Sequence, residues 1–459
     1  MDQLEALPAS ADTSLNGTGY SEEQQEYLRQ LELKRRGAQL ALPTSDEAVR
    51  LWLRALKEPV TRFGEGPYDR RERLRKLLAD DASNRRAVLQ LQSSAADKPA
   101  SNGAVPDDEE FFVPGGDELV KWRRWLVDYS LPRSRRRLAQ EKSYRQQPPR
   151  RVQEQRVALW QRTAALGLEA SQVGGERPLS ACSFSQDGHL MVTGDFGGAC
   201  RIWNREDCSL LRELNGMHSS RIGNVCFNPD RVSKLSLASC DNEGQIGLWG
   251  LSQVEAIGSL RGHTARVPSV AFHPSGRLLG SASFDYSWRL WDLEHSTCIQ
   301  LQEGHSRPVY SISFHPDGGL AATGALDAHA RLWDLRLGRA IWTLQGHHKT
   351  ILGLSFHPVR PLLATASEDG TVRIWDFRTL RPMMVLPAHS APISAVVWDE
   401  TGERLVTAGY EGLVRVWGAA DGRPLATLRG HEGKIMAVDC HGESILSASV
   451  DRTFKLWKS

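Results

Sequence analysis

Seven tryptophans recur at a nearly constant interval along the last two thirds of this chain. Neighbouring members are separated by 46, 42, 42, 42, 42 and 40 residues. The members are Trp203, Trp249, Trp291, Trp333, Trp375, Trp417 and Trp457. A fixed period of this length indicates a repeat architecture, in which each unit buries its apolar face against the next unit. This repeat restricts the possible folds more than any other feature of the sequence.

A second series of residues keeps step with the tryptophans. In four consecutive units a histidine precedes the tryptophan by 28 residues, and three of the tryptophans are followed by aspartate. The four histidines are His263, His305, His347 and His389. Between these marks, apolar and polar residues alternate and end in turn residues, as they do from Val309 to Gly318. This pattern is typical of short β-strands joined by tight turns.

The period and its Gly-His and Trp-Asp marks resemble the WD40 repeat family over roughly residues 164–459. The resemblance predicts an all-β, seven-bladed WD40 β-propeller, preceded by a mostly helical N-terminal region with flexible linkers. Only two residues follow Trp457, so the last blade lacks an outer strand, and an open ring would expose sheet edges. We expect residues 166–173 to close the ring by pairing with the last blade.

The same resemblance implies a hydrogen-bond network of His, turn Asp, Trp and a strand hydroxyl inside a blade. A buried imidazole needs partners on both nitrogens, and a buried indole N–H needs an acceptor. The matching sets are His263, Asp285 and Trp291; His305, Asp327 and Trp333; His347, Asp369 and Trp375; and His431, Asp451 and Trp457. Glu243 and Glu411 stand at the Asp position in two other units, and Gly175 and Gly197 replace His and Asp in the first. We expect these three blades to be held less tightly, by about 1 kcal/mol for each lost hydrogen bond.

The histidines are expected to be structural, and no metal or catalytic site is predicted. His273, His315 and His357 also repeat at 42 residues. Equivalent positions on neighbouring blades are about 10 Å apart, whereas zinc ligands lie about 2 Å from one ion. The seven cysteines are scattered without a C-x-x-C pair, as is typical of reduced thiols in an intracellular protein. We expect no cofactor.

The first third of the chain divides by composition. Residues 1–20 are predicted to be disordered and residues 80–110 to be a flexible linker, whereas residues 21–79 are predicted to be helical. Thr44 and Glu47 form a capping box, and Pro67 stands at the first position of a following helix. The glycines between the helices could belong to a phosphate loop or to a tight turn. A phosphate loop needs a preceding strand and a third glycine or a Gly-Lys-Ser/Thr ending, both missing here, so the turn is favoured.

The stretch LKEPVTRFGEGPYDRRERLRKLL, within about residues 44–79, resembles the splicing-factor motif of a few pre-mRNA splicing proteins. The segment WRRWLVDYSLPRSRRRLAQEK at residues 122–142 supports the same assignment. Combined with the repeats, these motifs resemble the pre-mRNA-processing factor 4 family. The resemblance implies that Phe63, Gly64 and Gly66 bind a partner. It also implies as partners the companion U4/U6 processing factor, a spliceosomal cyclophilin, and U4 and U6 snRNA, directly or through other proteins.

Residues 111–163 are predicted to be a basic, amphipathic helical segment. Leu119, Trp122, Leu126 and Tyr129 share one helical face, and Trp125 lies beside them. Exposed aromatic residues outside a large core are costly unless something buries them. Two alternatives remain open: this face packs against the chain's own propeller, or Trp122, Trp125, Leu126 and Tyr129 bind a groove of a partner. The basic run that follows suits solvent, an RNA backbone or a nuclear-import signal.

A basic residue follows the Gly-His position in six of the seven units. These residues are Arg177, Arg221, Arg266, Arg307, Lys349 and Lys434. In the family this loop lies on one face of the disc, so the resemblance implies a broken ring of positive charge. We expect this face to contact RNA phosphates or an acidic partner segment.

The sequence therefore predicts a non-catalytic nuclear scaffold. The resemblance implies a component of the U4/U6 snRNP and the U4/U6-U5 tri-snRNP that acts in pre-mRNA splicing and spliceosome assembly. No nucleophile–base pair is recognised, no apolar run suits a membrane span, and the start of the chain is not a secretory signal. The alternative is a WD40 adaptor of another complex, such as a ubiquitin-ligase substrate receptor, against which the FGEGP and YSLPR segments argue.

Overall fold

The computed structural model describes residues 46–56, 58–60, 67–80, 117–146, 148–230 and 235–458. They fall into two compact units, one before and one after residue 111. The predictions for residues 1–20, for 21–45 of the helical region, for most of 80–110, and for Phe63, Gly64 and Gly66 lie outside the described residues. Among the described helices, none has the length and apolar character needed to cross a membrane.

The first unit contains two helices, α2 (Asp46–Ala55) and α3 (Pro67–Asp80). Helix α3 begins at Pro67, whose missing N–H costs nothing at a first helical position, so this prediction is confirmed. The apolar residues of both helices repeat at helical spacing and meet in a small core of Val49, Leu53, Leu74 and Leu78. The Thr44 of the predicted capping box lies outside the described residues.

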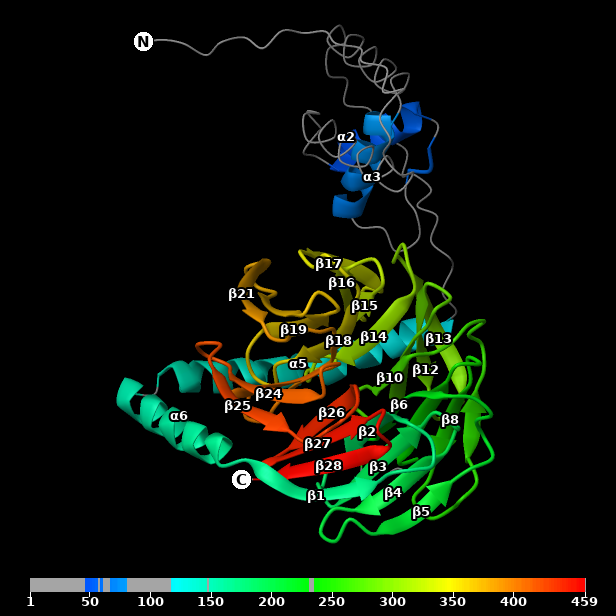
Figure 1. The fold of residues 1–459 in the computed structure, drawn as a ribbon. Coiled ribbons are helices and arrows are strands. Elements are labelled where there is room, and N and C mark those ends of the chain that lie inside the picture. The colour runs from blue at the N-terminus through cyan, green and yellow to red at the C-terminus, as the bar shows by residue number, and fades with distance from the viewer. Residues whose placement is uncertain are drawn as a thin grey trace, which may run out of the picture. The chain divides into compact units, whose positions relative to one another are not determined.

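The second unit is a propeller of seven four-stranded antiparallel sheets, which confirms the predicted fold class (Figure 1). Each tryptophan of the repeat lies in the third strand of its blade, counted from the centre. Blade one is β2 (Leu179–Phe184), β3 (Leu190–Asp195), β4 (Cys200–Asn204) and β5 (Leu210–Leu214); blade two is β6 (Ile222–Phe227), β7 (Leu237–Asp241), β8 (Ile246–Trp249) and β9 (Gly258–Leu260). Blade three is β10 (Ser269–Phe272), β11 (Leu278–Ala282), β12 (Ser287–Asp292) and β13 (Thr297–Glu303); blade four is β14 (Val309–Phe314), β15 (Leu320–Ala325), β16 (His329–Asp334) and β17 (Arg339–Gln345). Blade five is β18 (Ile351–Phe356), β19 (Leu362–Ser367), β20 (Thr371–Asp376) and β21 (Arg381–Pro387); blade six is β22 (Ile393–Trp398), β23 (Arg404–Gly409), β24 (Leu413–Gly418) and β25 (Pro424–Arg429).

Blade seven combines the two ends of the repeat region. It consists of β26 (Ile435–His441), β27 (Ser444–Ser449), β28 (Thr453–Lys458) and, as its outer strand, β1 (Gly167–Val173). Strand β1 pairs antiparallel with β28 from Gly167↔Lys458 to Val173↔Thr453 (Figure 1). The predicted ring closure is confirmed. Because β1 is largely exposed, it is held mainly by backbone hydrogen bonds rather than by buried side chains.

Two further helices, α5 (Asp117–Arg145) and α6 (Pro149–Ala164), belong to the same compact unit as the propeller. The core of this unit lies between neighbouring blades, where apolar residues of adjacent sheets interdigitate. One such cluster joins Trp288 and Leu290 of blade three to Phe314 and Trp333 of blade four, and Leu126 of α5 extends it.

Candidate binding face of the propeller

The histidines of the repeat hold the loops on one face of the propeller. In blade three, Nδ1 of His263 lies 2.7 Å from Asp285 Oδ2, and its Nε2 lies 2.6 Å from Ser281 Oγ. The same hydroxyl accepts a hydrogen bond from Trp291 Nε1–H at 2.8 Å. Equivalent contacts bring together His305, Asp327, Thr323 and Trp333; His347, Asp369, Thr365 and Trp375; and His431, Asp451, Ser447 and Trp457.

The protonation states follow from burial and these contacts. Burial lowers the pKa of His305 and of His431, although the hydrogen bond to the turn aspartate opposes this effect. Burial acts to raise the pKa of Asp327, but the hydrogen bond from His305 and other favourable contacts outweigh it and bring the pKa to about 2. A neutral imidazole therefore donates from Nδ1 to a carboxylate and accepts at Nε2 from the strand hydroxyl, so every polar atom of the network is satisfied.

The expectation that blades two and six are held less tightly is wrong. In blade six, Glu411 reaches His389 Nδ1 at 2.7 Å and so replaces aspartate directly. In blade two, His218 bonds to Asp241 at 2.8 Å, so the acceptor lies two residues before Glu243. Both networks are completed by a strand hydroxyl and the tryptophan.

In blade one an arginine, Arg201, takes the role that the histidine has in the other blades. The expectation that this blade is held less tightly did not consider Arg201. Its guanidinium contacts Asp195 Oδ2 at 2.8 Å and the Gly174 carbonyl oxygen at 3.1 Å. A Cβ at Gly175 would lie 2.4 Å from this guanidinium, which occupies the place of the missing imidazole. Trp203 still donates to Thr193 Oγ1 at 2.9 Å.

Replacing Thr407 by valine is expected to destabilise the propeller by about 2–4 kcal/mol. Valine keeps the shape of the side chain, but it leaves His389 Nε2 and Trp417 Nε1–H buried without partners, at about 1–3 kcal/mol each. Thr427→Val, on the exposed side of β25 in the same blade, is the matched control. Thermal melting compares the two variants, and equal melting temperatures would contradict the assigned network.

His273 and His357 connect neighbouring blades on the opposite face. His273 Nε2 lies 2.8 Å from the carbonyl oxygen of Gly318, and His357 Nε2 lies 3.0 Å from that of Gly402. In blade two, Asn228 Nδ2 makes the corresponding contact with Gly276 O at 3.2 Å. The buried Nε2 of His315 has no hydrogen-bond partner in the structure.

Helix α5 packs against this opposite face. Trp122, Trp125 and Leu126 join the core between blades three and four, and the Tyr129 ring lies 5.4 Å from that of His273. Of the two alternatives left open for the aromatic face, the structure therefore shows packing on the chain's own propeller. An amphipathic pattern records only that a face is buried and does not identify the surface that buries it.

The basic run after Tyr129 contributes polar contacts to the same surface. Arg137 Nε donates to Asp317 Oδ2 at 2.8 Å and its Nη1 donates to the Val359 carbonyl oxygen at 3.1 Å. Tyr144 donates to Glu403 Oε1 at 2.6 Å, and Arg156 of α6 pairs with the same carboxylate at 3.6 Å. With the ion pair of Arg162 to Glu443 at 3.0 Å, the two helices thus contact turns of blades four to seven.

The six basic residues named above lie at the other end of the inner strands. Arg307 stands just before β14, whereas Asp317, which contacts α5, follows its end, and a strand of this length spans about 20 Å. Arg177, Arg307, Lys349 and Lys434 are exposed, whereas Arg221 and Arg266 are half-buried. The propeller thus has one face on which α5 packs and an opposite face, here called the basic face, that carries these six side chains.

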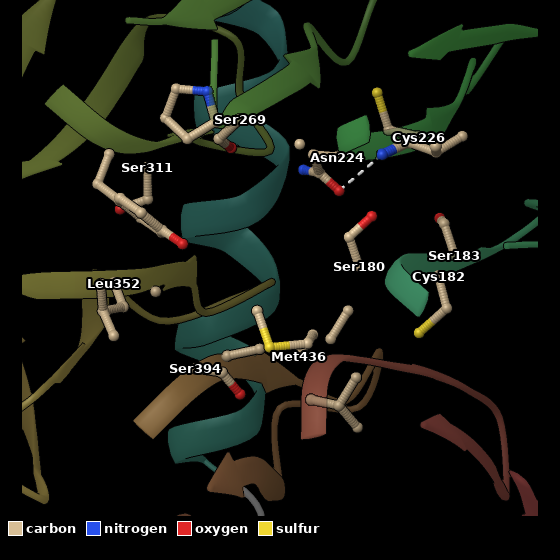
Figure 2. A pocket seen from close by; sticks show the side chains of 18 of the residues that line it. Ser180, Cys182, Ser183, Asn224, Cys226, Ser269, Ser311, Leu352, Ser394 and Met436 are labelled. Carbon is tan, nitrogen blue, oxygen red and sulfur yellow. Dashed lines mark hydrogen bonds between the residues drawn. The ribbon is translucent and has the colours of Figure 1, made fainter. Parts of the chain in front are cut away.

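A central channel of about 250 Å³ lies between the seven inner strands. Figure 2 shows residues with hydroxyl and amide side chains lining it, including Ser180, Asn224, Ser269, Ser311 and Ser394, with α5 passing behind. Arg221 and Arg266 line the same channel, but the other four basic residues do not. Within the described ranges, no group of three or more His, Cys, Asp or Glu side chains is arranged to hold a metal ion.

Two family models match this chain. The model described as pre-mRNA processing factor 4 (PRP4) like matches residues 49–77, which include much of α2 and α3. The model of the WD domain, G-beta repeat, matches residues 170–204, 254–292, 296–334, 338–376, 380–418 and 422–458. These ranges leave out most of blade two, whose turn aspartate is displaced by two residues.

Several curated proteins are similar to this chain. U4/U6 small nuclear ribonucleoprotein PRP4 of Saccharomyces cerevisiae is 34% identical over 294 residues, which cover 62% of this chain and 61% of that protein. The Prp4 protein of Homo sapiens is 40% identical over 216 residues (47% of this chain, 40% of that protein). The PRP4-like protein of Arabidopsis thaliana is 37% identical over 229 residues (49% and 41%). The chain thus spans less than two thirds of the length of each of these relatives.

Proposed function

Because this chain carries a pre-mRNA processing factor 4-like motif together with WD40 repeats, and is related to the U4/U6 Prp4 proteins, we propose that it is a non-catalytic scaffold in pre-mRNA splicing. It would act in the nucleus, as a component of the U4/U6 snRNP and the U4/U6-U5 tri-snRNP. The observation that carries this proposal is the combination of the two motifs in one chain, because WD40 repeats alone occur in proteins of many functions.

The architecture of the second unit suits a scaffold. Each blade is held by its own buried polar network, and the ring is closed by β1, so the loops of the basic face are rigidly presented. A rigid surface loses little conformational entropy when a partner binds. The six basic side chains give this face positive charge for RNA phosphates or for an acidic partner segment.

Partner binding divides between the two units in this proposal. The helix pair α2–α3 and the intervening residues Phe63, Gly64 and Gly66 would bind the companion U4/U6 processing factor. The arm formed by α5 and α6 would bind a spliceosomal cyclophilin. Trp122 and Leu126 could reach a partner's groove only if α5 left the propeller, because both side chains pack into its core. We therefore assign to this face of α5 the role of attaching the arm to the propeller.

Purification of the tagged full-length chain from nuclear extract tests the proposal. U4 and U6 snRNA are expected to co-purify with proteins of the same particle, and RNA and proteins are identified from the same sample. Recovery of ubiquitin-ligase subunits without snRNA would favour the adaptor alternative, and recovery of neither would refute the scaffold.

A pair of matched variants examines the helix pair. Leu53 is buried between α2 and α3, whereas Leu51 on the same helix is 57% exposed. Leu53→Ala is expected to destabilise the pair by about 2–5 kcal/mol and to reduce the recovered snRNA, whereas Leu51→Ala should leave recovery unchanged. Equal recovery with both variants would show that the pair does not attach the chain to the particle.

A further inference from the structure

Two arginines at the mouth of the central channel are held in place without an ionic partner. Arg221 and Arg266 come from neighbouring blades, and their guanidinium carbons lie 3.9 Å and 4.6 Å from the ring centres of Phe196 and Phe284. Such stacking fixes a long side chain in one orientation. No carboxylate among the described residues forms an ion pair with either arginine, and the Nε atoms of both are buried without a hydrogen-bond partner.

Other polar atoms of the inner strands and of their loops also have no hydrogen-bond partner among the described residues. Ser311 is 6% exposed and lines the channel, and its Oγ has no hydrogen-bond partner. Ser220 Oγ and Asn242 Oδ1, on the loops that flank Arg221, are likewise buried and without a partner. Buried polar groups are normally satisfied, so the two guanidinium groups that line the channel with unpaired Nε atoms indicate a site for a polar ligand.

The charge of the mouth selects an anion. Burial lowers the pKa of Arg221; Tyr310 opposes this effect, and the positive charge of Arg266 acts in the same direction as burial. A partly desolvated cation with a like charge nearby is destabilised, and a bound anion would relieve both effects. A planar guanidinium also offers paired donors that match the two oxygens of a carboxylate.

We propose that the channel mouth binds a glutamate or aspartate side chain of an extended acidic peptide, held by Arg221 and Arg266. This inference rests on the proposed function and names the partner chemistry of the basic face. The channel, with a volume of about 250 Å³ between the seven inner strands, has room for a single carboxylate side chain. An aromatic and arginine-rich centre is moreover typical of protein interfaces, in which a few such residues carry most of the binding energy.

Fluorescence anisotropy with the full-length chain tests this site. The probe is a fluorescein-labelled ten-residue peptide of alternating serine and glutamate. Its counterparts are the same peptide with glutamine in place of glutamate and a single-stranded RNA of ten nucleotides. The glutamate peptide is expected to bind saturably, and the glutamine peptide at least about tenfold more weakly, because a carboxylate is replaced by a neutral amide.

Matched variants locate the binding. Arg221→Gln with Arg266→Gln is expected to weaken peptide binding at least about tenfold, because the desolvated partners of the carboxylate are lost. Arg307→Gln with Lys349→Gln removes the same charge from exposed positions of the same face and should change the affinity by less than about threefold. Arg221→Lys with Arg266→Lys keeps the charge without the planar donors and should give an intermediate loss of peptide affinity. If the glutamine pair of variants proves unstable, the lysine pair still tests the two arginines.

Three results would overturn the proposal. The first is that the glutamate peptide shows no saturable binding up to about 1 mM, the weakest affinity expected of a specific site. The second is an equal loss of affinity in the channel pair and in the exposed pair of variants. The third is RNA binding that depends on Arg221 and Arg266 as strongly as peptide binding does. The last result would assign the mouth to RNA. These measurements use no snRNP, so the peptide site and the scaffold function can fail independently.

Discussion

Replacing Ser171 and Gln172 together by proline is expected to lower the melting temperature by roughly 10 °C. In an antiparallel ladder one of two adjacent N–H groups points at the partner strand, so at least one hydrogen bond to β28 is lost, and the ring is weakened where it closes. Lost pairing along β1 should cost about 3–5 kcal/mol, and 1 kcal/mol corresponds to about 2–4 °C in a domain of this size.

The matched control for the proline pair is Ser171→Thr with Gln172→Thr. Threonine keeps both N–H groups, favours strands, and retains a hydroxyl for the Lys455 ammonium, which donates to Ser171 Oγ at 2.7 Å. Calorimetry of the full-length variants gives the comparison. If the proline pair melts together with the threonine pair, β1 contributes little to closing the ring.

Lowering the pH from 7 to 4.5 is expected to destabilise the propeller through its interblade histidines. Burial lowers the pKa of His273 to about 4 and that of His357 to about 3, and the nearby Arg133 and Arg360 act in the same direction. The hydrogen bonds to Gly318 O and Gly402 O oppose this shift. An unfolded histidine has a pKa of about 6.5, so between these values the unfolded chain binds more protons than the folded one.

The sign of the effect follows from that difference. The stabilisation is complete above about pH 6.5 and is lost as the pH falls toward the folded pKa, with a cost of about 2–3 kcal/mol for each histidine at pH 4.5. The aspartates of the blade networks contribute little in this window. Asp327 and Asp451 keep pKa values of about 2, and their stabilisation is lost mainly below about pH 4.

The double variant His273→Asn, His357→Asn isolates this contribution. Asn228 shows that an asparagine amide can make the interblade contact, so stability at pH 7 should change by no more than about 1 kcal/mol, while the loss at pH 4.5 should become smaller. Urea denaturation at both pH values measures the difference. His295→Asn is the control, because His295 is exposed and its pKa is raised by the hydrogen bond and charge of Asp292. Its contribution has the opposite sign, being present at low pH and lost as the pH rises. An undiminished acid loss in the double variant would contradict the role assigned to the buried pair.

Periodicity predicted the blades because each unit must present the same surfaces to its neighbours. The seven tryptophans, the turn residues and the closing strand could therefore be placed from the sequence. In blade two the predicted acceptor, Glu243, was incorrect. The carboxylate that contacts His218 is that of Asp241, two positions earlier. The polar network of blade one was not predicted, because Arg201 occupies the place of the imidazole but comes from another part of the blade, strand β4. A comparison of equivalent positions does not reveal such an exchange.

The binding surface was less predictable for a related reason. The basic residues after the Gly-His positions could be counted from the sequence, but not which of them would be buried. Only the folded ring shows that Arg221 and Arg266 reach the channel while Arg307 and Lys349 point to solvent. The surface that buries the aromatic face of α5 could not be predicted either, because burial against the same chain and burial against a partner require the same amphipathic sequence.

Strand β1 leaves the ribosome before any blade is made, and its partner β28 leaves after six blades are complete. During synthesis, therefore, the ring cannot close until β28 is made, and until then the edge of β1 stays unpaired and accessible to chaperones. Translation that stops short of β28 would leave the ring open, with β1 lacking its partner strand. Pairing the earliest strand with the latest one thus makes closure of the ring depend on synthesis of all seven blades.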